Sequence, residues 1–144
     1  MSVRTSRPKG ILIAYWVFTI VFALQMGFTA YAQLCLPQVA EVFTKLGFPS
    51  YFRVELCIAK LVGVAVLVMP RVPSVLKEWA YAGFTFVLGS ALIAHLAVGD
   101  GVAAWGWSVG TFVLGALSYG LRRQLGHVET APSPGAEEAR AVAA

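Results

Sequence analysis

The sequence predicts an all-α integral membrane protein, a four-helix bundle with both termini in the cytoplasm and a short interfacial helix between helices 1 and 2. Of its 144 residues, 58% are hydrophobic and 12% are charged, roughly half the charged share of an average soluble domain. Mean hydropathy is +0.74, which leaves too little polar surface for a soluble globular domain. The eleven Lys and Arg residues form no continuous stripe, which argues against a nucleic-acid-binding protein.

Four apolar stretches are long enough to cross a hydrocarbon core about 30 Å thick. They cover residues 10–32, 51–69, 79–98 and 101–121. Pro70 and Pro73 separate the second from the third, because proline does not continue a helix, and a Gly-Asp-Gly turn at residues 99–101 separates the third from the fourth. Residues 124–144 have no apolar periodicity and predict a disordered cytoplasmic tail.

Basic residues near the ends of the spans predict the orientation. One side of the four-pass chain carries most of them: Arg4, Arg7, Lys9, Arg71, Lys77, Arg122 and Arg123. The other side carries Lys45 and Arg53 in its longer loop. We therefore expect a multi-pass membrane protein, with residues 1–9 and the C-terminal tail on the cytoplasmic side.

The first span has a second interpretation, as a secretory signal peptide. Three basic residues precede an apolar stretch at residues 11–24, and the Ala-Tyr-Ala triplet at residues 30–32 fits a cleavage site. Cleavage after Ala32 would leave three helices. The apolar character continues past residue 24 to the full length of a span, which favours retention of the segment.

Residues 34–50 are too short and too polar to cross the membrane. Apolar residues recur in them at helical spacing: Leu36, Val39, Ala40, Phe43 and Leu46. Pro37 suits a first helical turn, and Gly47 suits a helix end. The pattern predicts a short helix lying on the outer interface of the membrane.

Depth in the bilayer brings several polar residues to one level. At 1.5 Å of rise per residue, Glu55 lies roughly 6 Å and Lys60 roughly 13 Å below the outer boundary, and His95 lies roughly 6 Å below it. Polar residues on the first and fourth spans share this outer half: Gln25, Ser108 and Thr111. Ionisable residues inside a membrane are costly. We expect Glu55, Lys60 and His95 to form a polar pocket, with the other three residues in support, either for a ligand or as an ion-pair network that binds nothing.

Four blocks of sequence carry a resemblance to a known family. They are LGFPSYFRVEL at 46–56, AKLVG at 59–63, KEWAYAG at 77–83 and AHLAVGD at 94–100. In their order and spacing the chain resembles the DoxX-like family of small bacterial membrane proteins, over about residues 10–123. The resemblance implies a four-helix integral membrane protein of the bacterial inner membrane. Some relatives are small subunits of a thiosulfate:quinone oxidoreductase, and others partner superoxide dismutase and sulfurtransferase, while most members have no assigned activity.

Glycines on the spans predict close packing between helices. Gly63 lies on the same face as Lys60, and Gly106 with Gly110 forms a G-x-x-x-G pattern. The segment also fits the G-x-S-x-G pattern of serine hydrolases, which needs a strand-to-helix turn that an apolar helix does not provide. We therefore assign no catalytic residue from it.

The two cysteines and the histidine give no strong sign of redox or metal chemistry. Cys35 lies just past the first span and Cys57 lies inside the second, and there is no C-x-x-C. A disulfide needs Cα atoms within about 7 Å, so pairing stays open. His95 has no spaced Cys or carboxylate partner on its span, and no metal site is predicted.

Three functions stay open from the sequence. The first is an accessory or ligand-binding subunit that handles a quinone-like or other lipophilic small molecule. The second is a structural membrane anchor or interaction subunit without a ligand. The third is a small membrane-embedded enzyme, with Lys60 or Glu55 as acid or base. The expected partners are the lipid bilayer and soluble or membrane redox proteins, with no nucleic acid, and a homo-oligomer is left open.

Overall fold

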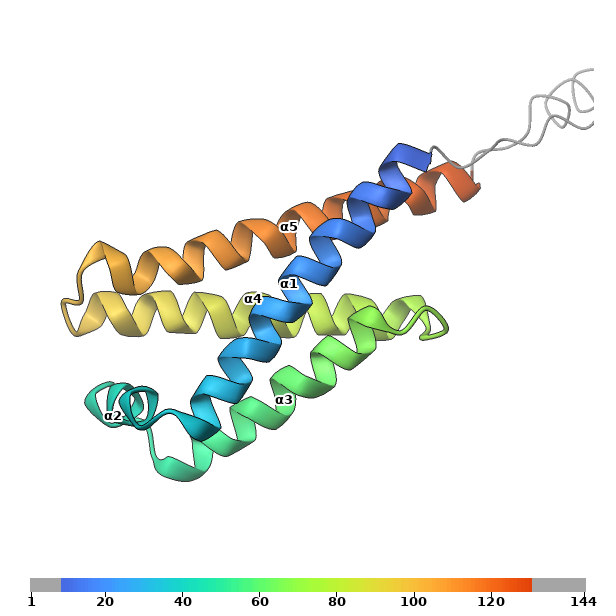
Figure 1. The fold of residues 1–144 in the computed structure, drawn as a ribbon. Helices are drawn as coiled ribbons and strands as arrows, with labels where there is room; N and C mark the ends of the chain where they lie inside the picture. The colour runs from blue at the N-terminus through green and yellow to red at the C-terminus, as the bar shows by residue number, and fades with distance from the viewer. Residues whose placement is uncertain (1–8, 131–144) are drawn as a thin grey trace, which may run out of the picture.

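A computed structural model describes residues 9–130, and their side chains through residue 126. The described part is entirely helical, with no strand (Figure 1). Its helices are α1 (Lys9–Cys35), α2 (Pro37–Lys45), α3 (Ser50–Val68), α4 (Ser74–Ala97) and α5 (Val102–Thr130). The all-α prediction is therefore confirmed for these residues, and each predicted span corresponds to one long helix.

The four long helices contact one another in a ring. α1 packs against α3 and α5, and α4 also packs against α3 and α5, so that α1 and α4 occupy opposite corners. α2 packs against α1 and α3. Figure 1 shows α2 and the α4–α5 turn at one end of the molecule, which we call the α2 end. The start of α1, the α3–α4 turn and the last turns of α5 lie at the other, the terminal end (Figure 1).

The surface of the helices is apolar enough for a bilayer. α1, α4 and residues 102–126 of α5 are each long and apolar enough to cross a membrane. Large apolar side chains point outward, such as Phe86, which is 76% exposed, and Leu24, which is 69% exposed. Exposed apolar surface on this scale is typical of lipid-facing helices. The chain is therefore described as a membrane protein.

Two phenylalanines and two glycines form the centre of the core. Phe22 of α1 and Phe84 of α4 meet edge to face across the ring, with centroids 5.1 Å apart. A Cβ atom at Gly63 of α3 would lie 2.7 Å from the Phe84 ring, and one at Gly115 of α5 would lie 3.0 Å from the Phe22 ring. The two glycines therefore leave the space that the two rings fill.

Buried hydroxyl groups join three helices next to this core. Ser118 of α5 shares hydrogen bonds of 2.7 Å with Thr19 of α1 and with Tyr81 of α4. All three residues are buried. Because a hydroxyl can donate and accept at once, the three groups satisfy one another without water. They fix the register of α1, α4 and α5 relative to each other.

The helix ends differ from the predicted ends in three places. α1 continues to Cys35, α4 begins at Ser74, directly after Pro73, and α5 continues to Thr130. The predictions followed the thickness of the hydrocarbon core, but backbone hydrogen bonding continues beyond it. Residues 124–130 are thus helical where the sequence predicted a disordered tail. The rest of that predicted tail lies outside the described residues, as do residues 1–8.

The short helix forms as predicted. Pro37 occupies its first turn. Gly47, at φ +79°, ends it, with the amides of Gly47 and Phe48 donating to the carbonyls of Thr44 and Phe43. This pair of bonds is a Schellman motif, which needs a left-handed residue that glycine supplies at no steric cost.

Candidate functional site

The turn after α4 determines where Asp100 lies. α4 ends at Ala97 and is followed, after Val98, by Gly99, which has φ +72°. The Gly99 amide donates to the Leu96 carbonyl at 3.2 Å, and the Asp100 amide donates to the His95 carbonyl at 3.0 Å. This second Schellman motif folds Asp100 back over the last turn of α4. The Asp100 carboxylate Oδ2 consequently lies 2.8 Å from Nδ1 of His95.

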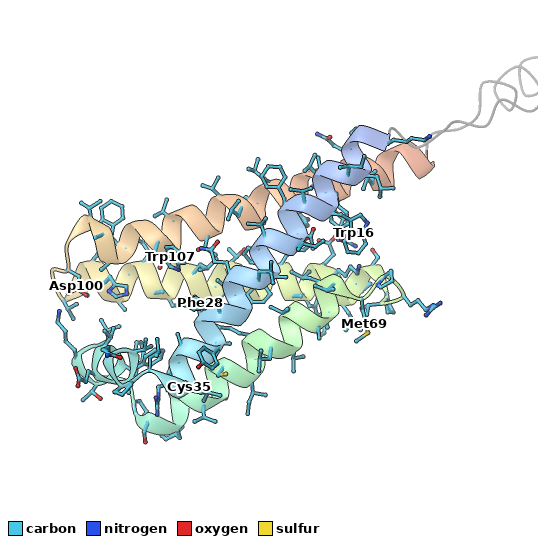
Figure 2. The ribbon with its side chains drawn as sticks, in the orientation of Figure 1. Trp16, Phe28, Cys35, Met69, Asp100 and Trp107 are labelled. Atoms are coloured by element: carbon cyan, nitrogen blue, oxygen red, sulfur yellow. The ribbon has the colours of Figure 1, made fainter. Side chains whose placement is uncertain are left out.

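Asp100 also forms an ion pair with Lys45, the last residue of α2. Hydrogen bonds from Lys45 and then from His95 lower the pKa of Asp100 below its ordinary value of 3.8. The carboxylate is therefore ionised at neutral pH and acts only as an acceptor. Nδ1 of His95 must then donate the proton, which leaves Nε2 for other contacts. Figure 2 shows Asp100 in the α4–α5 turn at the α2 end.

A second polar group lies between α1 and α3. The Lys60 ammonium donates to Oε1 of Gln33 at 2.7 Å, and Arg53 donates to the Gln33 backbone carbonyl, also at 2.7 Å. Gln33 is buried. Its side-chain nitrogen has no hydrogen-bond partner among the described residues. A buried donor without an acceptor costs about 1 to 3 kcal/mol, and both N–H groups of this amide lack an acceptor among the described residues.

Gln33, Lys60 and His95 line one cavity of about 470 Å³ at the α2 end. All five helices contribute to its wall, for example Gln33 of α1, Phe43 of α2, Lys60 of α3, His95 of α4 and Trp107 of α5. Most of the other lining residues are apolar. The polar ones are Thr29, Gln33, Lys60, Ser90 and His95. A mostly apolar wall with a few polar groups is typical of small-molecule sites.

Aromatic rings from α2, the following turn and the start of α3 line part of the cavity. Phe43, Phe48 and Phe52 all line it. The rings of Phe48 and Phe52 stack with centroids 5.0 Å apart, and those of Phe43 and Phe48 lie 6.0 Å apart. α2 therefore forms part of the cavity wall at the end of the molecule where the α4–α5 turn also lies.

The structure brings together two of the three ionisable residues that the sequence grouped. Lys60 and His95 both line the cavity. Glu55 does not join them, because its side chain is exposed and it forms no ion pair within the described part of the chain. Glu55 and Lys60 are about 140° apart on an ideal helix, and the Lys60 side chain turns to Gln33 instead.

The three supporting residues lie on the α1–α5 interface. Gln25 of α1 donates a hydrogen bond to the Thr111 hydroxyl of α5, which in turn donates to the Trp107 carbonyl at 2.8 Å. Ser108 and Thr111 are buried. None of the three lines the cavity. The hydrogen bond between Gln25 and Thr111 joins α1 to α5.

Of the glycines expected to pack, only Gly63 meets another helix. A Cβ at Gly110 would meet no atom within 4 Å, and one at Gly106 would meet only Val102 of the same helix. The G-x-x-x-G pair thus makes no close helix contact within this chain, contrary to the prediction. Gly115, five residues farther along α5, occupies the packed position instead.

Residues 9–126 contain neither a disulfide bond nor a candidate metal site. Cys35 is exposed and Cys57 is buried, and both are free thiols. The Cys57 thiol donates to the Ala30 carbonyl at 3.3 Å. No group of three or more His, Cys, Asp or Glu side chains in this range could hold a metal ion.

Two residues of the site were missed from the sequence. Gln33 continues a buried stripe of α1: Thr19, Phe22, Met26, Ala30 and Gln33. That stripe has helical spacing and would have pointed to Gln33, had the predicted span not ended at residue 32. The sequence assigns Asp100 only to the turn between the third and fourth spans, whereas its carboxylate pairs with Lys45 and His95.

Comparison with known proteins gives one match. A family model described as the DoxX-like family matches residues 17–120, which include every described residue of the cavity wall. The search of curated proteins gave no match. The search of solved structures also gave none.

Proposed function

This chain belongs to the DoxX-like family, and from that premise we propose that the cavity at the α2 end binds an amphipathic, carbonyl-bearing small molecule of the quinone type. We propose the same membrane setting that the sequence predicts: a four-helix bundle in the inner membrane, with α3 as its remaining span and the terminal end in the cytoplasm. The ring of helix contacts and the basic residues of the terminal end support that setting.

The shape of the cavity supports a ligand with a polar head and an apolar tail. Its volume of about 470 Å³ is within the common range for small-molecule sites. A groove of about 410 Å³ between α3 and α4 shares Lys60 and Val87 with the cavity. Its other lining residues are apolar or glycine. A head at Lys60 could therefore extend its tail along this groove.

The donors on the wall favour a carbonyl oxygen as the recognised group. The Gln33 amide has an unused N–H, and the Lys60 ammonium has three donors, of which one bonds Gln33. Both are donor groups, and Lys60 is positively charged, so an acceptor oxygen suits them best. The unsatisfied Gln33 amide beside Lys60 is the observation that carries this proposal, because a ligand oxygen would remove its cost.

His95 supports a link to proton transfer. Its Nδ1 is held by Asp100, and Asp100 is paired with Lys45, whose side chain is 58% exposed. A bound quinone supplies electron and proton uptake as its chemistry. In this chain, His95 could hold a proton at Nε2, and Asp100 with Lys45 would connect it to solvent.

A quenching experiment tests the proposal, because Trp107 lines the cavity and quinones quench indole fluorescence on contact. Purified full-length protein in detergent is titrated with a short-chain benzoquinone. We expect saturable quenching that Trp107→Phe reduces, and an affinity about tenfold lower in Lys60→Met, from the loss of a charge-assisted hydrogen bond.

Glu55→Gln is the matched control, since Glu55 is an exposed charged residue of the same helix. It should bind the benzoquinone as the unaltered protein does. Equal affinity in Lys60→Met and the unaltered protein would contradict the ligand function.

One observation favours the second candidate, a structural anchor without a ligand. Lys60 and His95 each already have a partner within the chain. On this alternative, Lys60→Met lowers the melting temperature, and the benzoquinone shows no saturable quenching in any variant. Turnover of a lipophilic substrate by the purified protein, lost in Lys60→Met, would instead favour the membrane-embedded enzyme.

A further inference from the structure

The terminal end contains a second cavity with a different character. Its volume is about 440 Å³, and its lining residues come from three helices and the α3–α4 turn. They include Trp16 of α1, Ser74 and Lys77 of α4, and Arg122 and Arg123 of α5. We infer that this cavity binds an anionic phosphate-type group, and the inference is independent of the function proposed for the α2 end.

The charges on this wall do not balance. Lys77, Arg122 and Arg123 are cations, and Glu78 is the one carboxylate among the lining residues. Glu78 pairs with Arg122 at 2.5 Å. Lys77 and Arg123 form no ion pair with any described residue, so the wall has two cations in excess. A dianionic or monoanionic group is the ligand class that compensates this excess.

The Lys77 side chain is the strongest indication that this cavity binds an anion. The residue is only 7% exposed, although it is a lysine. Its ammonium makes one hydrogen bond, at 3.4 Å to the Leu67 carbonyl. An ammonium has three donors, and a buried charge without a partner is costly. An anion in the cavity would satisfy the donors that the chain leaves unused.

The first turn of α4 adds backbone donors to the same wall. Pro73 precedes the helix, and no side chain caps the α4 N-terminus. The free amides and the helix dipole favour an anion at this end. Ser74 lines the cavity, and its carbonyl and hydroxyl oxygens each accept a bond of 3.2 Å from Arg122. Arg122 is thereby held beside the helix start.

The surroundings place this cavity where a membrane meets water. Tyr15 and Trp16 line it, and such rings are enriched at membrane interfaces. Figure 2 shows Trp16 and Met69 at the terminal end, opposite Asp100 and Trp107. Basic pockets between helices on the cytoplasmic side of membranes recognise phospholipid headgroups. The phosphate group can therefore come from an anionic phospholipid or from free phosphate in solution.

A thermal-shift measurement on the detergent-solubilised full chain distinguishes these two sources. Phosphatidylglycerol, phosphatidylcholine and inorganic phosphate are added separately. A rise in melting temperature with phosphatidylglycerol alone supports the anionic lipid, and a rise with inorganic phosphate supports the free ion. If neither raises the melting temperature of the unaltered protein, the inference is overturned.

Variants then test whether the compound that raises the melting temperature binds in this cavity. Lys77→Met and Arg123→Gln should each weaken the apparent affinity for the active compound by about tenfold, as the loss of a charge-assisted contact predicts. Arg71→Gln is the matched control, because Arg71 is exposed in the α3–α4 turn and does not line the cavity. If Lys77→Met does not fold, Arg123→Gln still tests the site, because Arg123 is exposed. An unaltered affinity in Arg123→Gln would contradict the site.

Discussion

The two ends of the molecule use ionisable residues in opposite ways. At the α2 end, Lys45, Asp100 and His95 form a chain of paired groups, and Lys60 is paired with Gln33. At the terminal end, Lys77 and Arg123 have no counter-ion within residues 9–126. The apolar core around Phe22 and Phe84 lies between them. The difference suggests neutral, carbonyl-type chemistry at one end and anion binding at the other.

Removal of the Phe84 side chain from the core should destabilise both ends of the molecule. Phe84→Ala removes the aromatic contact between α1 and α4 and leaves a cavity, at a cost of about 3 to 5 kcal/mol. We expect a large fall in the melting temperature of the detergent-solubilised protein.

Phe86→Ala is the control for this change. Phe86 belongs to the same helix and is 76% exposed, so its removal should alter stability by less than about 0.5 kcal/mol. Equal losses in the two variants would show that the core does not hold the two ends together.

A glycine substitution tests the same core from the α3 side. Gly63→Ala places a Cβ 2.7 Å from the Phe84 ring, and overpacking of this kind costs about 1 to 3 kcal/mol. Gly110→Ala meets no atom within 4 Å and should leave the melting temperature unchanged. A reversed order of the two melting temperatures would contradict the packing described for α3 and α4.

Acid should weaken the α2 end through Asp100. Its pKa is below 3.8 in the folded protein, so its pairing stabilises the fold above the ordinary pKa. That contribution is lost as pH falls through the lower folded value. The melting temperature of the unaltered protein should therefore fall below about pH 4.

Asp100→Asn removes the titrating group. The variant should be less stable than the unaltered protein at neutral pH, and the difference should become smaller in acid. A constant difference from pH 7 to pH 3 would show that the pairing of Asp100 with Lys45 and His95 contributes no stability.

Hydropathy and turn residues predict where the helices lie, but they do not predict side-chain partners. The pattern of the sequence located all five helices, since span length and proline or glycine breaks depend on local sequence. The similar depth of Lys60 and His95 in the bilayer could be predicted from the helix rise per residue alone. The direction of the Glu55 side chain could not be predicted in this way, because it depends on how α3 is rotated relative to its neighbours.

His95 pairs with Asp100 because of a turn that ideal helix geometry does not predict. On a continuous helix, residues 95 and 100 are about 140° apart. The helix ends between them at Ala97, and the turn through Gly99 brings the Asp100 carboxylate to the ring. Gln33 was missed for a related reason, since α1 continues past the predicted end of the span.

Infrared spectroscopy of a bound, carbonyl-labelled benzoquinone tests the ligand function most directly. Hydrogen bonds from Gln33 and Lys60 should lower the carbonyl stretching frequency of the bound molecule below its value in an apolar solvent. In Lys60→Met, the frequency should move back toward the apolar value. A bound carbonyl that vibrates as it does in hydrocarbon, in both proteins, would contradict recognition by these donors.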